Sequence, residues 1–197
     1  YCNFPLEVQK IPSVGNLFQP NIEKILELNP DLIIASTHFQ KEVLLKLEEV
    51  SMTVVILLDD DSFSGIYDNI LNTGLLLNRE TQANIVVESM KQRVHYLSNL
   101  VLDYAKPKIY YVLGYGEYGN YTAGGDTFIS DIITLAGGIN TAQDNIGWAY
   151  SLERLLEDNP DIILCSNKPG FKEGLIDAVG YKHLPAIINR NIFTIDS

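Results

Sequence analysis

A repeated segment constrains the fold of this chain more than any other feature of its sequence. Residues 21–36 (NIEKILELNPDLIIAS) and 151–166 (SLERLLEDNPDIILCS) align without gaps, and half of the aligned positions are identical. The first residues of the two copies, Asn21 and Ser151, are good helix N-caps, and the shared Asn-Pro-Asp ends a helix because proline cannot continue it. The apolar run that closes each copy predicts a strand buried on both faces of a parallel sheet. The repeat therefore predicts two related α/β lobes.

One long amphipathic helix is predicted between the two copies, from about Asn78 to Tyr104. Apolar residues recur there at three- and four-residue steps, Asn78 can cap the start, and Lys106-Pro107 ends the pattern. A helix of about 27 residues is roughly 40 Å long, which suits a connector between two lobes better than a crossover within one sheet. An ordinary long core helix is the alternative interpretation. The expected domains are an N-terminal lobe, a connecting helix and a C-terminal lobe, at residues 1–77, 78–105 and 106–197.

The rest of the chain alternates between strand and helix patterns, as is typical of mainly parallel sheets. The expected strands cover residues 53–58, 108–113 and 191–195, and the expected helices cover residues 63–76, 127–136 and 171–179. The sequence therefore predicts the α/β class for both lobes.

The composition argues against several classes of function. The chain of 197 residues carries 14 basic and 25 acidic residues, a net charge of −11. Such a chain is poorly suited to nucleic acid or to a polybasic membrane anchor, because nothing in it neutralises phosphates. No apolar run approaches the roughly 20 residues that a membrane helix needs. The two cysteines, Cys2 and Cys165, lack metal-ligand spacing, so no structural zinc site is expected.

Five segments, taken in order, resemble a known family. They are YCNFPLEVQKIPSVG, NIEKILELNPDLIIAS, LGYGEYGNYTAGGDTFISDIITLAGGIN, GWAYSLERLLEDNPDIIL and HLPAIINRNIFTID, and together they cover nearly the whole chain. The chain is similar in them to the helix-linked substrate-binding proteins of ABC importers. That family takes up vitamin B12, ferric siderophores, haem and related metal chelates.

The resemblance implies a fold and a function. It implies two Rossmann-like lobes joined by one long α-helix, with the ligand cleft between the lobes, and no enzymatic activity or resident cofactor. The implied partners are a small-molecule metal chelate and the permease subunits of the transporter, and the implied location is extracytoplasmic, in the periplasm or as a cell-surface lipoprotein. Against the family pattern the chain lacks an opening strand and helix and a final helix, so the first lobe is expected to be incomplete.

Glu23 and Glu153 occupy equivalent places near the starts of the two repeated helices. One interpretation is that each stabilises its helix dipole by about 0.3–1 kcal/mol. The resemblance implies a second role, because in the family a glutamate at this place on each lobe docks onto arginines of the permease. Carboxylate–arginine pairs can be bidentate, so they orient the partner as well as attract it. We favour the docking role, because the residue recurs at the same site in both copies.

Ligand-binding residues are expected in the loops that follow the carboxyl ends of the strands, where open α/β sheets place their ligands. Tyrosines in such a loop suit large planar ligands, because they combine an apolar ring with a hydroxyl group. This rule selects Ser36, Thr37 and His38 in the first lobe, and Tyr115, Tyr118, Tyr121, Ser166, Asn167 and Lys168 in the second. The family resemblance adds Phe4, the Leu17-Phe18 turn and Trp148.

Two further patterns have ordinary interpretations. His38 is placed to ligate iron or cobalt together with a tyrosine, but a lone histidine is more often a surface residue, so no protein metal site is predicted. A G-x-G-x-x-G pattern, which is typical of dinucleotide-binding sites, follows a predicted strand at Gly114, Gly116 and Gly119. Since no helix is expected to begin at the third glycine, we expect these glycines to let the loop approach a bulky ligand.

The sequence leaves the identity of the ligand open. The YCNFP opening and Gly147-Trp148 favour a corrinoid, whereas Leu17 and Ser36 stand where B12-binding relatives tend to have aromatic residues. Ferric siderophores are anionic and favour basic residues, of which Lys168 is the one evident candidate. Haem and oxyanion ligands also occur in the family.

An enzyme or metallocluster protein on a related two-lobed scaffold is the alternative function. It needs clustered cysteines, histidines or paired carboxylates. The one acidic run, Asp59-Asp60-Asp61, is interpreted as a solvated turn, and no nucleophile, base and orienting group can be assembled from the sequence. No catalytic residue is therefore predicted.

Overall fold

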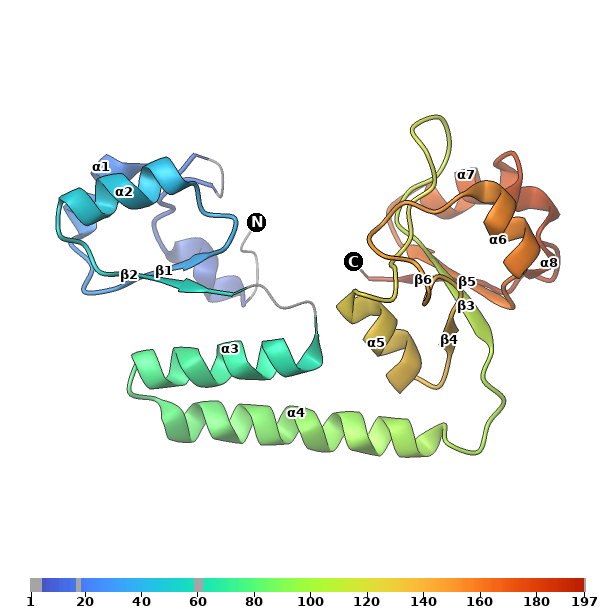
Figure 1. The fold of residues 1–197 in the computed structure, drawn as a ribbon, viewed down its shortest axis with the longest axis horizontal. Helices are drawn as coiled ribbons and strands as arrows, with labels where there is room; N and C mark the ends of the chain where they lie inside the picture. Colours follow the sequence, from blue (N-terminus) through green and yellow to red (C-terminus); the bar gives the residue numbers. More distant parts are fainter. Residues whose placement is uncertain (1–4, 17–18, 59–61, 197) are drawn as a thin grey trace. The chain divides into compact units, whose positions relative to one another are not determined.

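The computed structural model describes residues 5–16, 19–58 and 62–196. The chain forms two compact units, Tyr1–Asp60 and Asp61–Ser197. The division lies earlier than the lobe boundary expected at residue 77, because the helix at 63–76 packs with the residues that follow it. Within each unit helices alternate with parallel strands (Figure 1), so the predicted α/β class is confirmed.

The first unit packs helices against a small parallel sheet. Its elements are a 3₁₀ helix (Leu6–Lys10), α1 (Ile22–Leu28), β1 (Ile33–Ser36), α2 (Lys41–Glu49) and β2 (Val54–Leu57). Strands β1 and β2 pair in parallel, and α1 and α2 lie on one side of them (Figure 1). Ile25, Val43 and Leu47 form the core, against which Ile33 and Val54 pack.

The prediction that the strand of the first repeat is buried on both faces is wrong for β1. Ile34 is 40% exposed, whereas Ile33, on the other face, packs into the helical core. The described sheet of this unit has two strands, with α1 and α2 covering one side. In the second repeat the prediction holds better for β5 (Ile162–Ser166). Ile163 and Cys165 are fully buried on one face, and Leu164, on the other face, packs against a second core cluster.

The two copies of the repeat fold alike. Helices α1 and α6 (Leu152–Asp158) have the same length, and each begins at a side chain, Asn21 or Ser151, that accepts a hydrogen bond from a backbone N–H three residues on. Each ends at an asparagine in the left-handed conformation, with φ of 43° at Asn29 and 45° at Asn159. The asparagine therefore ends the helix, and the proline after it prevents the helix from resuming.

The second unit opens with a pair of helices, α3 (Phe63–Leu76) and α4 (Glu80–Leu100), that run side by side (Figure 1). A Cβ atom on Gly74 would lie 2.4 Å from the Cβ of Ala83, so glycine permits their close approach. The predicted long helix is present with 21 residues, about 31 Å at 1.5 Å per residue. The predicted cap at Asn78 is wrong. Asn78 has φ of 52° and follows the end of α3, so it ends that helix rather than starting α4.

A four-stranded parallel sheet in the order β4-β3-β5-β6 forms the centre of the rest of the second unit. Tyr110 and Ile163 in the central strands, with Leu155, Leu175 and Tyr181 from the surrounding helical segments, are at most 1% exposed. The strands are β3 (Lys108–Val112), β4 (Ile139–Asn140), β5 and β6 (Ile192–Ile195), and the helical elements are α5 (Phe128–Leu135), α6, α7 (Phe171–Asp177), a 3₁₀ turn (Tyr181–His183) and α8 (Pro185–Ile188).

The helices and the cysteines of the structure relate to what the composition predicts. No helix within the described ranges has the length and apolar character needed to cross a membrane. Cys165 is a buried free thiol whose pKa is raised by burial, and Cys2 lies outside the described residues.

The asparagine at the end of α6 generates a stability prediction. In Asn159→Ala the free energy of unfolding should fall by about 1 kcal/mol, because a Cβ-bearing residue without a local side-chain hydrogen bond is strained at positive φ. Asn159→Gly is the control and should retain stability. Urea unfolding followed by far-UV circular dichroism measures both, and equal losses in the two variants would contradict the helix-ending role.

Candidate functional site

The loop that follows β3 carries three of the predicted ligand-binding residues, Tyr115, Tyr118 and Tyr121. Its ends are held together, since the backbone N–H of Leu113 donates to Tyr121 O at 2.9 Å and that of Tyr121 donates to Gly114 O at 2.9 Å. Gly116 and Gly119 have φ of 102° and 107°, a conformation that favours glycine. The next helix, α5, begins only at Phe128, so the geometry of a dinucleotide loop is absent there.

The three tyrosines of this loop have different environments. Tyr118 is 87% exposed and Tyr121 is 41% exposed. Tyr115 instead turns toward the core, where its hydroxyl donates to Phe171 O at 3.2 Å and its ring stands edge-on to the rings of Phe171 and Tyr181. Tyr115 therefore anchors the loop, while Tyr118 and Tyr121 expose aromatic surface.

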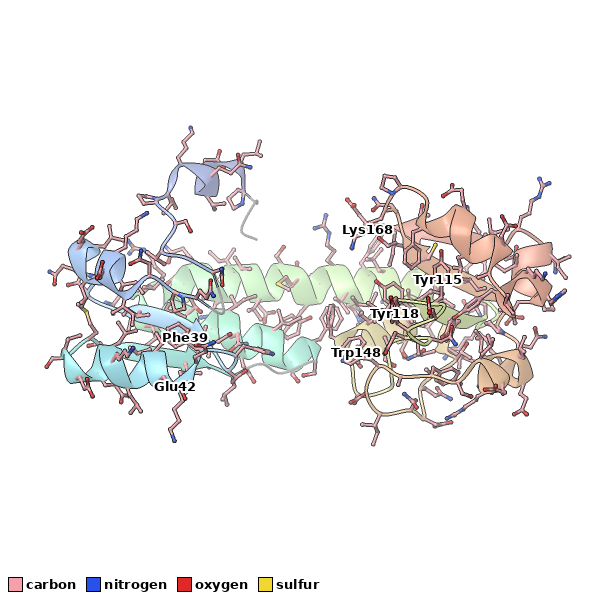
Figure 2. All side chains as sticks on the ribbon, turned by 90° about the horizontal axis from the view of Figure 1, so that it is seen from above. Phe39, Glu42, Tyr115, Tyr118, Trp148 and Lys168 are labelled. Carbon is pink, nitrogen blue, oxygen red and sulfur yellow. The ribbon has the colours of Figure 1, made fainter. Side chains whose placement is uncertain are left out.

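Trp148 joins these residues from a second loop. It is 43% exposed and lines a cavity of about 370 Å³ with Leu113, Gly114 and Tyr121. The Tyr121 hydroxyl donates to Tyr118 O at 2.9 Å, which ties the Tyr121 side chain to the backbone of Tyr118. Tyr121 and Trp148 thus share one cavity after β3, and Figure 2 shows Tyr118 and Trp148 in the same part of the second unit.

Lys168 lies in a separate, polar hollow of about 590 Å³ after β5. Asn167 and Thr194 line the same hollow, and Lys172 is also part of it but donates to Ile192 O at 2.9 Å. The backbone N–H of Lys168 donates to the Oγ of Ser166, which is buried at the end of the strand. Lys168 is therefore an exposed cation at the same end of the sheet as the aromatic cavity (Figure 2).

The candidates in the first unit follow β1. Ser36 ends the strand, and its Oγ accepts a hydrogen bond from the backbone N–H of His38 at 3.3 Å, with Thr37 between them. Ser36 also lines an apolar hollow of about 570 Å³ along β1. Phe4 and Phe18 lie outside the described residues, as does the Asp59-Asp60-Asp61 run. Within the ranges that the structure describes, no cluster of three or more histidine, cysteine or acidic side chains could hold a metal ion.

Sequence reasoning missed two residues beside these candidates, Phe39 and Glu42 (Figure 2). Phe39 lines the hollow along β1, and Glu42 lies in the first turn of α2. Both were overlooked because α2 itself was not predicted. Its signal was present, since Val43 and Leu47 are one helical turn apart and both are buried.

Glu23 and Glu153 are both exposed, in the first turns of α1 and α6. Glu153 also lines a hollow of about 480 Å³ whose other walls include Asn120, Tyr121 and Ser151. The next residue, Arg154, is exposed and lies along its own helix, with its guanidinium 5.1 Å from the ring centre of Tyr150 and 3.6 Å from the Asp158 carboxylate. Glu153 therefore presents its carboxylate at the surface, beside the loop that carries the aromatic residues.

The buried tyrosines beneath the loop have raised pKa values. Tyr181 is 1% exposed, and burial raises its pKa from 10 to about 12, because a phenolate would be desolvated there. Its hydroxyl donates to Asn120 Oδ1 at 2.9 Å, so the neutral phenol holds the end of the loop. Burial also raises the pKa of Tyr110.

This cluster predicts alkaline sensitivity. The folded pKa of Tyr181 exceeds its unfolded value, so its contribution to stability is full below pH 10 and is lost as the pH rises toward 12. Urea unfolding at pH 8 and at several pH values above 10 should show this loss, and Tyr181→Phe should reduce it. Tyr104→Phe, at a residue that is 74% exposed, is the control. An equally steep loss in Tyr181→Phe would refute the assignment.

Comparison with known proteins places the chain among binding proteins. The family model described as periplasmic binding protein matches residues 1–197. The chain is 27% identical over 200 residues to the uncharacterized ABC transporter substrate-binding lipoprotein YvrC of Bacillus subtilis, a match that covers 98% of this chain and 63% of that protein. It is 31% identical over 160 residues to a cobalamin-binding protein of Halobacterium salinarum, covering 78% of this chain and 42% of that protein. The chain therefore spans less than two thirds of the length of these relatives.

A solved structure gives the same picture of the fold. The periplasmic haem-binding protein HutB of Vibrio cholerae superposes with a TM-score of 0.84 and 26% identity, over 96% of this chain and 77% of that one.

Proposed function

This chain belongs to the periplasmic binding protein family, and from this premise we propose that it captures a metal chelate outside the cytoplasm and delivers it to the permease of an ABC importer. The chelate is a corrinoid such as vitamin B12 or an iron complex such as haem or a ferric siderophore. The protein acts in the periplasm or as a cell-surface lipoprotein. Relatives named for ABC transport, cobalamin binding and haem binding support this class of ligand.

The grouping of Tyr118, Tyr121 and Trp148 at the carboxyl end of a parallel sheet carries this proposal. Open α/β sheets bind ligands at this end. Exposed aromatic rings supply flat apolar surface at a low cost in side-chain entropy, which suits a macrocycle. Lys168, in the neighbouring polar hollow, supplies a positive charge for an anionic substituent of the chelate.

The family match also favours transport over the alternative of an enzyme on a two-lobed scaffold. A binding protein needs complementary surface and a docking partner, whereas an enzyme needs a positioned nucleophile or base. The aromatic and cationic residues described above fit the first requirement. We therefore assign them to recognition of the chelate.

Ligand binding can be tested with the single tryptophan of the chain, Trp148. Cyanocobalamin, haemin and a ferric siderophore are titrated separately, and one of them should quench the Trp148 emission saturably, because the chelate lies against the indole ring. Tyr118→Ala should weaken the binding of that chelate about tenfold, through loss of aromatic contact.

Tyr104→Ala provides the matched control, because it removes a tyrosine that is 74% exposed on another part of the second unit. It should leave the affinity unchanged. Absence of saturable quenching by all three chelates, or equal effects of the two tyrosine substitutions, would contradict the proposed ligand class.

Docking through Glu23 and Glu153 can be tested by reversing both charges. The double variant Glu23→Arg/Glu153→Arg should abolish uptake through the transporter and leave chelate affinity intact, because an arginine repels the permease arginines and does not touch the ligand. Uptake is measured in cells that carry the cognate permease, and affinity is measured on the purified protein.

Glu27 and Glu157 offer a control with the same change in net charge. They repeat one turn further along the same helices and are also exposed. Glu27→Arg/Glu157→Arg should retain most of the uptake. The docking role is wrong if this control loses as much uptake, or if charge reversal at Glu23 and Glu153 weakens chelate binding.

A further inference from the structure

Two loops of the second unit are hydrogen-bonded to each other along their length, and Trp148 lies near the end of one of them. The backbone N–H of Thr122 donates to Trp148 O at 2.8 Å, that of Gly124 donates to Gly147 O at 3.0 Å, and that of Gly125 donates to Asn145 O at 2.8 Å. The first loop therefore holds three backbone carbonyl groups in the segment that carries the tryptophan.

Asp126 adds a side-chain contact at the residue before the tryptophan. Its Oδ1 accepts a hydrogen bond from the backbone N–H of Gly147 at 2.8 Å. Gly147 has φ of 77°, a conformation that other residues adopt only at a cost. Because Asp126 binds the N–H of Gly147 and Gly124 binds its C=O, the backbone that enters Trp148 is held on both sides. A carboxylate is a stronger acceptor than a neutral oxygen, so this contact strengthens the arrangement.

The surrounding contacts leave the second loop little freedom. The Asn145 side-chain amide donates to Ile146 O at 3.3 Å and to Ala149 O at 3.2 Å, on either side of the Gly147-Trp148 pair. A Cβ atom on Gly125 would lie 1.9 Å from Gln143 O, so the two loops are in close backbone contact. The backbone that carries the indole ring is therefore held by these contacts, and Asp126 adds one from 21 residues away.

We propose that Asp126 is a positioning residue that holds Trp148 in its place in the ligand cavity by fixing the backbone of Gly147. The ring lines that cavity with Leu113, Gly114 and Tyr121. The consequence for ligand affinity rests on the proposed function, in which Trp148 contacts the chelate. The consequence for the tryptophan itself does not depend on any ligand.

The test compares three variants by the emission of Trp148. Asp126→Ala should shift the emission maximum, increase quenching by acrylamide, and weaken binding of the chelate that quenches the wild type about tenfold. Asp126→Asn retains an oxygen acceptor and should recover most of both properties. Asp144→Ala removes an exposed carboxylate from the neighbouring loop and should match the wild type. Far-UV circular dichroism verifies that each variant is folded.

Hydrogen exchange of the Gly147 amide in the wild-type protein provides a measurement that needs no variant. Protection of this amide supports the hydrogen bond to Asp126, and fast exchange in the folded protein overturns it. Unchanged Trp148 emission and quenching in folded Asp126→Ala, or failure of Asp126→Asn to restore them, also overturns the proposal.

The ligand measurements separate the two hypotheses. If the emission changes in Asp126→Ala but no chelate binds the wild type, the proposed function fails and the positioning role stands. If a chelate binds the wild type and Asp126→Ala with equal affinity, Asp126 does not position Trp148 for that ligand.

Discussion

The parallel pairing of β3 with β5 is the constraint on which the candidate site depends. The two strands align Ile109 with Ile162 and Val112 with Cys165, and they are the inner strands of their sheet. Parallel strands end at the same edge, so the loop after Val112 and the loop after Ser166 leave the sheet close to each other. This brings the tyrosines of one loop and Lys168 of the other to one end of the unit (Figure 2).

A buried polar side chain makes that edge rigid. Asn140 is 1% exposed, and its amide nitrogen donates to Ala123 O at 2.9 Å and to Ser130 Oγ at 3.0 Å. Its Oδ1 accepts a hydrogen bond from the N–H of Ala142 at 3.1 Å. Polar groups that are buried and fully paired specify one arrangement, because any other would leave them unpaired in a dry interior. Asn140 therefore fixes where both loops leave the core, the loop that carries Trp148 and the loop that is hydrogen-bonded to it.

The repeat shows which structural features are decided by nearby residues and which are not. Its caps, its helix lengths and the asparagines at its helix ends are alike in both copies, because each depends on residues within a few positions. Burial of the strands differs, because Ile34 is 40% exposed whereas the equivalent Leu164 packs against a core cluster. Burial depends on what packs against the other face of the sheet, and that information lies far away in the sequence. The helix α2 was missed for another reason, because a nine-residue helix with two buried residues gives only a weak local pattern.

Periodicity, caps and motif order were enough to predict the α/β class, the parallel strands, the long helix and the family, because these are local properties of the chain. The sequence also indicated that tyrosines and Trp148 follow strand ends. The tertiary structure was needed to separate Tyr115 from Tyr118 and Tyr121. The ring of Tyr115 packs against the core and its hydroxyl is hydrogen-bonded there, whereas the other two tyrosines are at the surface. Only the tertiary structure showed that Asp126 supports Trp148. These roles depend on contacts between residues that are far apart in the chain, and hydrogen bonds of that kind leave no periodic signal in a single sequence.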